Sequence, residues 1–181
     1  MITCMPDYYW QSFLPVTAAG YAHWLRGHGS LTLRIQQRCA AFSVRNVRNC
    51  LATAAYDEIA LLGLPSRRKI YTREVLLYAD GMPVIFAHSV VAPQHLRGAW
   101  RVLQNLGDKP LGALLFAHPL VERAPLHYKA LKPRHALYRS AAAALDTTPG
   151  RLWARRSLFS LYGSPLLVTE VFLPDILKLQ K

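Results

Sequence analysis

The sequence predicts a single α+β domain built on an antiparallel β-sheet with helices packed against it. Two pairs of strand-like segments flank turn dipeptides, Asp80-Gly81 and Gly163-Ser164, and segments with helical spacing lie between the pairs. The length of 181 residues suits one domain. A hydrophobic content of 52% supplies a core and excludes an intrinsically disordered chain. We therefore expect residues 1–181 to fold as one unit.

The N-terminal part predicts a helix, a strand and a loop, in that order. Residues 16–28 are typical of a short helix that ends at Gly27 and Gly29. Residues 41–53 alternate apolar and polar side chains, which indicates a half-buried strand. Residues 61–68 contain glycine and proline and are expected to form a loop.

The two hairpins are the firmest expectations. Residues 69–79 and 82–92 flank Asp80-Gly81, a dipeptide suited to a type I′ turn. Residues 151–162 and 165–174 flank Gly163-Ser164, which predicts a type II′ turn because glycine accepts a positive φ at the first central position.

The segment between the hairpins predicts mostly helices. Within residues 94–107, helical spacing relates four apolar side chains: Leu96, Trp100, Leu103 and Leu106. Residues 110–116 predict a further short helix and residues 120–128 a further strand. Residues 129–150 form a basic, alanine-rich connection to which the sequence assigns no structure.

Alternation along the second hairpin isolates one acidic residue among apolar ones. Glu170 shares its face of the strand with Leu166, Val168 and Phe172. A buried carboxylate without a partner is costly, so Glu170 should find one or shift its pKa upward. A two-residue Gly163-Ser164 turn places Ser157 opposite Glu170 and Arg155 diagonal to it on the same face.

The same test isolates Arg73 on the first hairpin. Arg73 shares a face with Tyr71, Val75 and Leu77, and an Asp80-Gly81 turn places His88 opposite it. Arginine is well suited to bidentate binding of a carboxylate. Three structural alternatives remain open: Arg73 and Glu170 pair with each other, this face is solvated, or His88 is a hydrogen-bonded core histidine.

Four segments resemble the chorismate pyruvate-lyase family in matching order: REVLLYADGMP (residues 73–83), SVVAP (89–93), LGDKPLGALLF (106–116) and WARRSLFSLYGSPLLVTEVFLP (153–174). The resemblance is good over residues 73–174 and faint over residues 18–72. It implies an antiparallel sheet, a ligand enclosed in an internal cavity, and conversion of chorismate to 4-hydroxybenzoate and pyruvate without a cofactor or metal. That reaction supplies the ring of ubiquinone.

The resemblance also implies site residues. The family's carboxylate-binding arginine falls on Arg73 and its site glutamate on Glu170, with main-chain contacts from Leu31 and Leu111. Glu170 could act as a general acid or only orient the substrate. Relatives tend to have arginine where this chain has His88, so either Arg155 or His88 is expected to meet the second carboxylate of the substrate.

Other function classes receive less support. A non-catalytic effector-binding domain of winged-helix repressors would share this fold, but such domains normally follow a DNA-binding domain. The net charge of +12 suggests nucleic acid, yet no binding motif accompanies it. We expect no signal peptide at the N-terminus, and no apolar run approaches a membrane span. The three cysteines form no C-x-x-C pair. We expect a cytoplasmic monomer acting on a small molecule.

Overall fold

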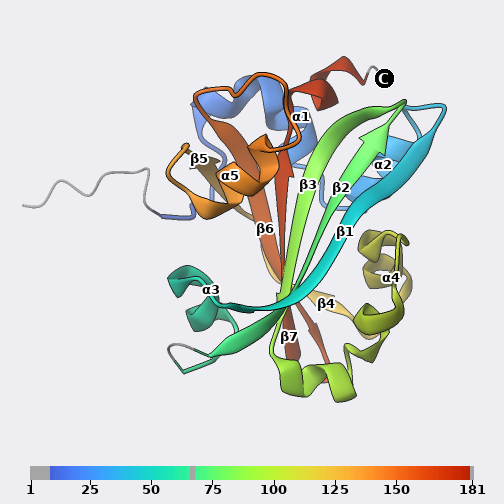
Figure 1. Cartoon of the computed structure of the whole chain (residues 1–181), viewed down its shortest axis with the longest axis vertical. Helices are drawn as coiled ribbons and strands as arrows, with labels where there is room; N and C mark the ends of the chain where they lie inside the picture. The colour runs from blue at the N-terminus through green and yellow to red at the C-terminus, as the bar shows by residue number, and fades with distance from the viewer. Residues whose placement is uncertain (1–8, 66–67, 180–181) are drawn as a thin grey trace, which may run out of the picture.

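The computed structural model describes residues 9–65 and 68–179. Seven strands in this part of the chain form one antiparallel sheet in the order β1-β2-β3-β7-β6-β4, and β5 pairs with the other end of β6 (Figure 1). The strands are β1 (Phe42–Thr53), β2 (Lys69–Ala79), β3 (Met82–Val91), β4 (Glu122–Arg123), β5 (His127–Leu131), β6 (Leu152–Leu161) and β7 (Ser164–Phe172).

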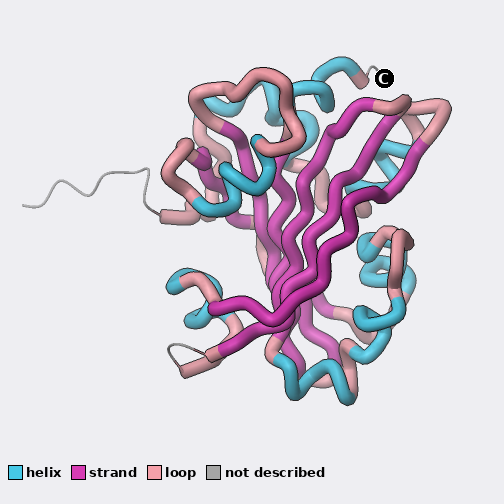
Figure 2. The backbone as a smooth tube through the Cα atoms, viewed as in Figure 1, coloured by secondary structure: helices cyan, strands magenta, loops and turns pink. Residues whose placement is uncertain are grey.

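Helices cover both faces of the sheet, which confirms the predicted α+β class (Figures 1 and 2). The α-helices are α1 (Ala22–Leu25), α2 (Leu31–Gln36), α3 (Tyr56–Leu61), α4 (Leu111–Ala117) and α5 (Ala136–Ala142). Four 3₁₀ segments are also described: η1 (Val16–Tyr21), η2 (Pro93–Arg97), η3 (Arg101–Asn105) and η4 (Pro174–Lys178). Side chains of α1, α2 and α4 join the cores on one face, and those of α3 and α5 join the cores on the other.

The first hairpin turns where the sequence predicts, but its register is shifted. Asp80 and Gly81 both have positive φ, 49° and 81°, as a type I′ turn requires. Beyond the turn, β3 carries a bulge: Tyr78 pairs with Pro83, and the next pair on the ladder is Leu77 with Ile85. An extra residue moves every later side chain of β3 by one position, and therefore to the other face.

The second hairpin is built differently from the prediction. Leu161 pairs with Ser164, so the turn residues are Tyr162 and Gly163, with φ of 51° and 72°. Two positive φ values make this a type I′ turn, whose twist matches the flanking strands. The predicted Gly163-Ser164 type II′ turn is therefore wrong, and every cross-strand pair in this hairpin shifts by two residues.

Glycine and proline explain where the other predicted elements divide. Residues 94–107 form η2 and η3 instead of one helix, because Gly98 adopts a non-helical backbone (φ −129°, ψ −118°) between them. The strand predicted over 120–128 becomes β4 and β5, with Pro125, which cannot donate to a ladder, in between. The helical segment at 16–28 comprises η1 and α1, and it ends at Leu25, before Gly27.

Three short helices were not predicted. Both α2 and α3 have only six residues, too few to show a periodic pattern. The connection over 129–150 contains the end of β5 and the helix α5. Cys39 and Cys50 are free thiols, whereas residues 1–8, including Cys4, lie outside the described part.

Candidate active site

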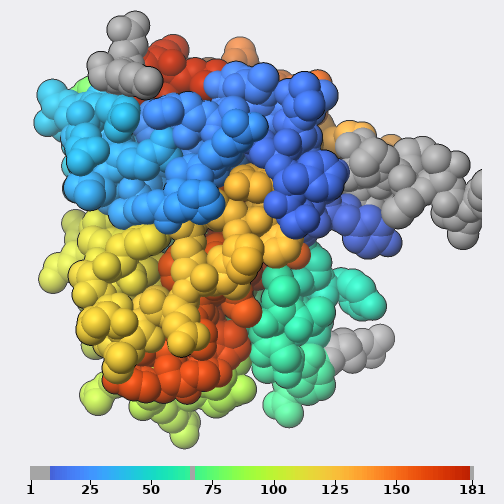
Figure 3. Space-filling model, turned by 180° about the vertical axis from the view of Figure 1, so that it is seen from behind, coloured from blue at the N-terminus to red at the C-terminus, as the bar shows by residue number. Residues whose placement is uncertain are grey.

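A cavity lies between one face of the sheet and the helices α2 and α4. The strands β2, β3, β6 and β7 form its floor, and the two helices cover it. In Figure 3 the blue N-terminal segment and the yellow segment around residues 110–125 lie against each other over this face. The polar and charged side chains that line the cavity are Thr32, Arg73, Ser89, Arg123, Ser157 and Glu170.

Arg73 brings a buried positive charge to this cavity. Its residue is only 2% exposed, and Nη2 donates hydrogen bonds to the carbonyl oxygens of Gly107 (2.9 Å) and Lys109 (3.0 Å). Its Nε is buried without a hydrogen-bond partner, and no carboxylate within the described residues pairs with the guanidinium. Burial lowers the pKa of Arg73 from its ordinary value, although Tyr71 opposes that shift. A negatively charged ligand would restore the charge balance.

Glu170 lines the same cavity and is paired with Arg155. The two residues lie directly opposite each other on β7 and β6, and Nε of Arg155 lies 2.5 Å from Oε2 of Glu170. The expected position of Ser157 opposite Glu170 is wrong, because the turn lies one residue earlier, which shifts the pairing by two residues, so that Ser157 pairs with Val168. Arg73 and Glu170, the two side chains isolated by alternation, thus face one cavity, but they do not pair with each other.

Arg155 is engaged by protein groups through Nε and Nη1. It is 1% exposed and does not line the cavity. Its Nη1 donates to the carbonyl oxygens of Trp24 (3.3 Å), Leu25 (3.2 Å) and Gly27 (2.6 Å). Arg155 therefore holds Glu170 and the end of α1 in place, and its expected role toward a second substrate carboxylate loses support.

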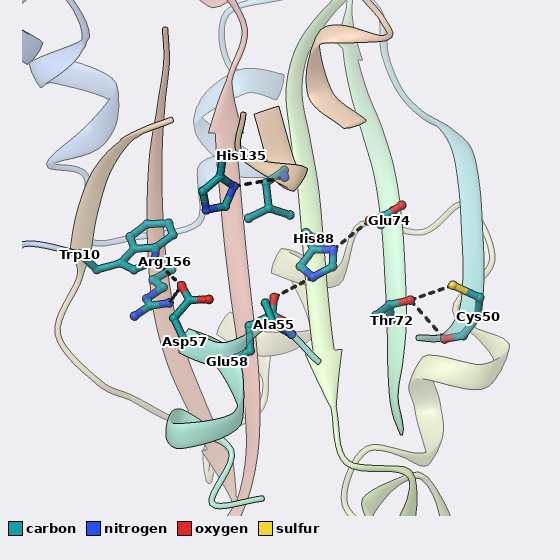
Figure 4. A network of polar contacts seen from close by, with 11 residues as sticks. Trp10, Cys50, Ala55, Asp57, Glu58, Thr72, Glu74, His88, His135 and Arg156 are labelled. Carbon is teal, nitrogen blue, oxygen red and sulfur yellow. Dashed lines mark hydrogen bonds and ion pairs between the residues drawn. The ribbon is translucent and has the colours of Figure 1, made fainter. Parts of the chain in front are cut away.

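His88 lies on the opposite face of the sheet. The bulge in β3 places it across from Glu74 instead of Arg73. Its Nδ1 lies 3.0 Å from Oε1 of Glu74, and its Nε2 lies 3.0 Å from Oε1 of Glu58 (Figure 4). Burial opposes the charged form, but the hydrogen bonds with the two carboxylates outweigh it and raise the pKa of His88 to about 9. The prediction that His88 meets the substrate is wrong, and the core-histidine alternative is confirmed.

Leu31 and Leu111 occupy equivalent positions in the two covering helices. Each is the first residue of its helix, so its N–H lacks a partner within the helix. Ser30 caps α2 by accepting a hydrogen bond from the N–H of Leu33. The helices approach closely at Gly112, where a Cβ atom would lie 3.0 Å from Oγ1 of Thr32. The structure therefore brings all four predicted site residues, Arg73, Glu170, Leu31 and Leu111, around the cavity.

Arg123 is the charged residue of the cavity lining that the sequence did not single out. It lies on β4 and lines the cavity together with Phe116 and Phe159. The sequence does place a basic residue, Arg123, within the strand predicted over 120–128. Because that strand ends at Arg123, alternation along it does not show which face the side chain occupies.

The profile of the family described as chorismate lyase matches residues 9–180. The chain belongs to the chorismate lyase family. Two relatives named probable chorismate pyruvate-lyase support the match. The one from Nitrosospira multiformis is 54% identical and covers 86% of this chain and 87% of its own length. The one from Nitrosomonas europaea is 49% identical and covers 91% and 93%.

Solved structures show how widely the chorismate lyase fold is shared. The effector domain of PhnF from Mycobacterium smegmatis has a TM-score of 0.59 at 15% identity, covering 82% of this chain and 91% of its own. The ligand-binding domain of a putative GntR-family regulator from Bordetella bronchiseptica has a TM-score of 0.51 at 20% identity, with 75% and 86% covered. At such identities the likeness concerns the fold alone.

Within residues 9–65 and 68–179, no three His, Cys, Asp or Glu side chains are grouped as a metal site requires. No helix in these ranges is long and apolar enough to cross a membrane.

Proposed function

We propose that this chain converts chorismate to 4-hydroxybenzoate and pyruvate. The observation that carries the proposal is the buried guanidinium of Arg73, which lines a covered cavity without a carboxylate partner among the described residues. Chorismate has a carboxylate on its ring and another on its enolpyruvyl ether, so a cavity that binds it must supply positive charge. The names of the relatives point to the same reaction.

The driving force of the reaction comes from the substrate itself. The bond between the ring and the ether oxygen breaks, and hydrogen leaves the neighbouring carbon that bears the hydroxyl group. The ring becomes aromatic and keeps that hydroxyl as the phenol, while the enolpyruvyl group leaves and becomes pyruvate. Because aromatisation drives the reaction, the protein must mainly orient the substrate, exclude water and stabilise the charge that develops.

Arg73 is proposed to bind the ring carboxylate. Its Nη2 is fixed by the carbonyls of Gly107 and Lys109, so the guanidinium is held in one orientation before substrate arrives. The N–H groups of Leu31 and Leu111 are proposed to add hydrogen bonds to the substrate from the covering helices.

Glu170 is proposed to orient the substrate by accepting a hydrogen bond from its ring hydroxyl. Oε2 already accepts from Nε of Arg155, which leaves Oε1 for the ligand. Hydrogen could then pass within the substrate, from the ring carbon to the methylene of the enolpyruvyl group, while the ether bond breaks. The alternative role of Glu170 is a general acid that protonates the leaving group.

The experiment is an incubation of the purified protein with chorismate, in which 4-hydroxybenzoate and pyruvate are both quantified. We expect the two products in equal amounts. The structural likeness to regulator domains makes a binding protein the second candidate. Saturable binding of chorismate without formation of either product would reject the lyase and support that candidate.

The proposed setting is a cytoplasmic monomer, since one chain supplies both the floor and the cover of the cavity. We propose no nucleic-acid partner on the basis of the net charge of +12.

A further inference from the structure

The cavity holds a second guanidinium without a carboxylate partner among the described residues. Arg73 and Arg123 both line it, and Glu170 is the carboxylate in the lining. The charge of Glu170 is matched by Arg155 at 2.5 Å, and Arg155 lies behind the lining. Two positive charges therefore remain for a ligand, and chorismate carries two negative charges.

The surroundings of Arg123 hold its guanidinium in place without neutralising it. The guanidinium carbon lies 5.3 Å from the ring centroid of Phe116 and 5.4 Å from that of Phe159. Its Nη1 donates a hydrogen bond to the carbonyl of His28, whereas Nε is buried with no partner in the described part of the chain. A fixed, partly unsatisfied guanidinium beside a cavity is suited to binding a carboxylate.

Burial and the nearby charge of Arg155 both lower the pKa of Arg123, although Glu170 opposes this. The charged form of Arg123 is thus costly in the empty protein, as expected for a group that awaits an anion. The contacts of Arg123 also join three segments: β4, the end of α4 at Phe116, and the loop before α2 at His28. The guanidinium that would bind an anion here is thus anchored to both parts of the cover.

We infer that Arg123 binds the carboxylate of the enolpyruvyl ether, the group that the structure leaves without Arg155 or His88 as a partner. The inference rests on the proposed function, because it assumes that chorismate occupies this cavity with its ring carboxylate on Arg73. It also predicts a difference between substrate and product: 4-hydroxybenzoate keeps the ring carboxylate and has lost the other one.

The test is the variant Arg123→Met, assayed for turnover of chorismate and, separately, for affinity of 4-hydroxybenzoate by calorimetry. We expect kcat/KM for chorismate to fall about thirtyfold or more. The dissociation constant of 4-hydroxybenzoate should stay within about threefold of wild type. Arg101→Met, an exposed arginine on η3 outside the cavity, is the matched control and should change neither quantity.

The outcomes separate this inference from the proposed function. If wild type forms no product, the proposed function fails. If wild type turns over chorismate and Arg123→Met retains its kcat/KM, the inference alone fails. An equal loss of affinity for 4-hydroxybenzoate would also overturn it, because the product lacks the carboxylate in question.

A conservative variant covers the case in which Arg123→Met does not fold. Arg123→Lys keeps the charge but loses the planar fork and its packing between the two rings. We expect kcat/KM for chorismate to fall about tenfold, with binding of 4-hydroxybenzoate retained. A wild-type kcat/KM in Arg123→Lys, together with unchanged salt dependence of KM, would overturn the inference.

Discussion

Arg155 and Glu170 lie directly opposite each other on β6 and β7, and Nε of the arginine is 2.5 Å from Oε2 of the glutamate. The same guanidinium donates hydrogen bonds to the carbonyls of Trp24 and Leu25 in α1 and of Gly27 just after it. One buried side chain therefore fixes both the carboxylate of the cavity and the segment that leads into the covering helix α2.

Replacement of Arg155 by methionine should impair stability and catalysis together. Removing one partner of a buried ion pair is expected to lower the free energy of unfolding by about 3–5 kcal/mol. We also expect kcat to fall at temperatures well below the melting transition, because Glu170 loses its fixed position. Arg156→Met is the control: Arg156 pairs with Asp57 on the other face, so it should cost stability without lowering kcat in the folded fraction. Equal kcat in Arg155→Met and wild type would contradict the positioning role.

Glu170→Gln distinguishes orientation from proton donation. Glutamine keeps an oxygen that can accept from Arg155 and a side chain that can contact the substrate hydroxyl. If Glu170 only orients the substrate, kcat should stay within about tenfold of wild type, the difference between a charged and a neutral hydrogen bond. Glu170→Ala should lose considerably more. A Gln variant as inactive as the Ala variant would favour the general-acid role instead.

The His88 cluster predicts a loss of stability at alkaline pH. The folded-state pKa of about 9 lies above the ordinary value of 6.5, so the folded state binds the proton more tightly than the unfolded state. The stabilisation is complete below pH 6.5 and is lost as pH rises through 9, an effect of about 3 kcal/mol. Denaturant unfolding at several pH values measures it.

The charged groups in contact with His88 are Glu58 from α3 and Glu74 from β2. Arg48 from β1 lies 3.8 Å from Glu74. His88→Gln should show a flatter dependence of unfolding free energy on pH between 6.5 and 9. The same slope in the variant and wild type would assign the effect to another group.

Gly112 predicts a steric limit on the contact between the two covering helices. Alanine in a helix normally gains about 0.5–1 kcal/mol over glycine, but a Cβ here would lie 3.0 Å from Oγ1 of Thr32. We expect Gly112→Ala to lower the melting temperature and raise KM for chorismate. The variant Thr32→Ala lacks that oxygen. In this background, Gly112→Ala should raise the melting temperature by about 2–4 °C relative to Thr32→Ala alone. A stabilising effect in both backgrounds would contradict the close approach.

The sequence predicts most of the sheet because hairpin signals are local. Asp80-Gly81 identifies its turn, and alternation places Arg73 and Glu170 each on the apolar face of its own hairpin. The register of the two hairpins could not be predicted in the same way. Neither the bulge at Val84 nor the positive φ of Tyr162 has a distinctive sequence signal. Those one- and two-residue shifts decide which side chains meet, so the predicted partners of Arg73 and Glu170 were wrong.

Only part of the cover of the cavity was predicted: the short helix expected over 110–116 is α4, whereas α2 was not expected. The helices α2 and α4 have six and seven residues and are held by tertiary contacts such as the approach at Gly112. Leu31 and Leu111 came only from the family resemblance. Arg123 lies on a two-residue strand, too short for any pattern to show which way it points.

The most direct test of the central claim is the formation of 4-hydroxybenzoate from chorismate by wild type and Arg73→Met, with equilibrium binding of 4-hydroxybenzoate to both. Wild type should release 4-hydroxybenzoate and pyruvate in equal amounts. Arg73→Met should lose about a hundredfold or more in kcat/KM and most of its affinity for the product, because both ligands carry the ring carboxylate. Wild-type turnover and product affinity in the Arg73→Met protein would contradict the account.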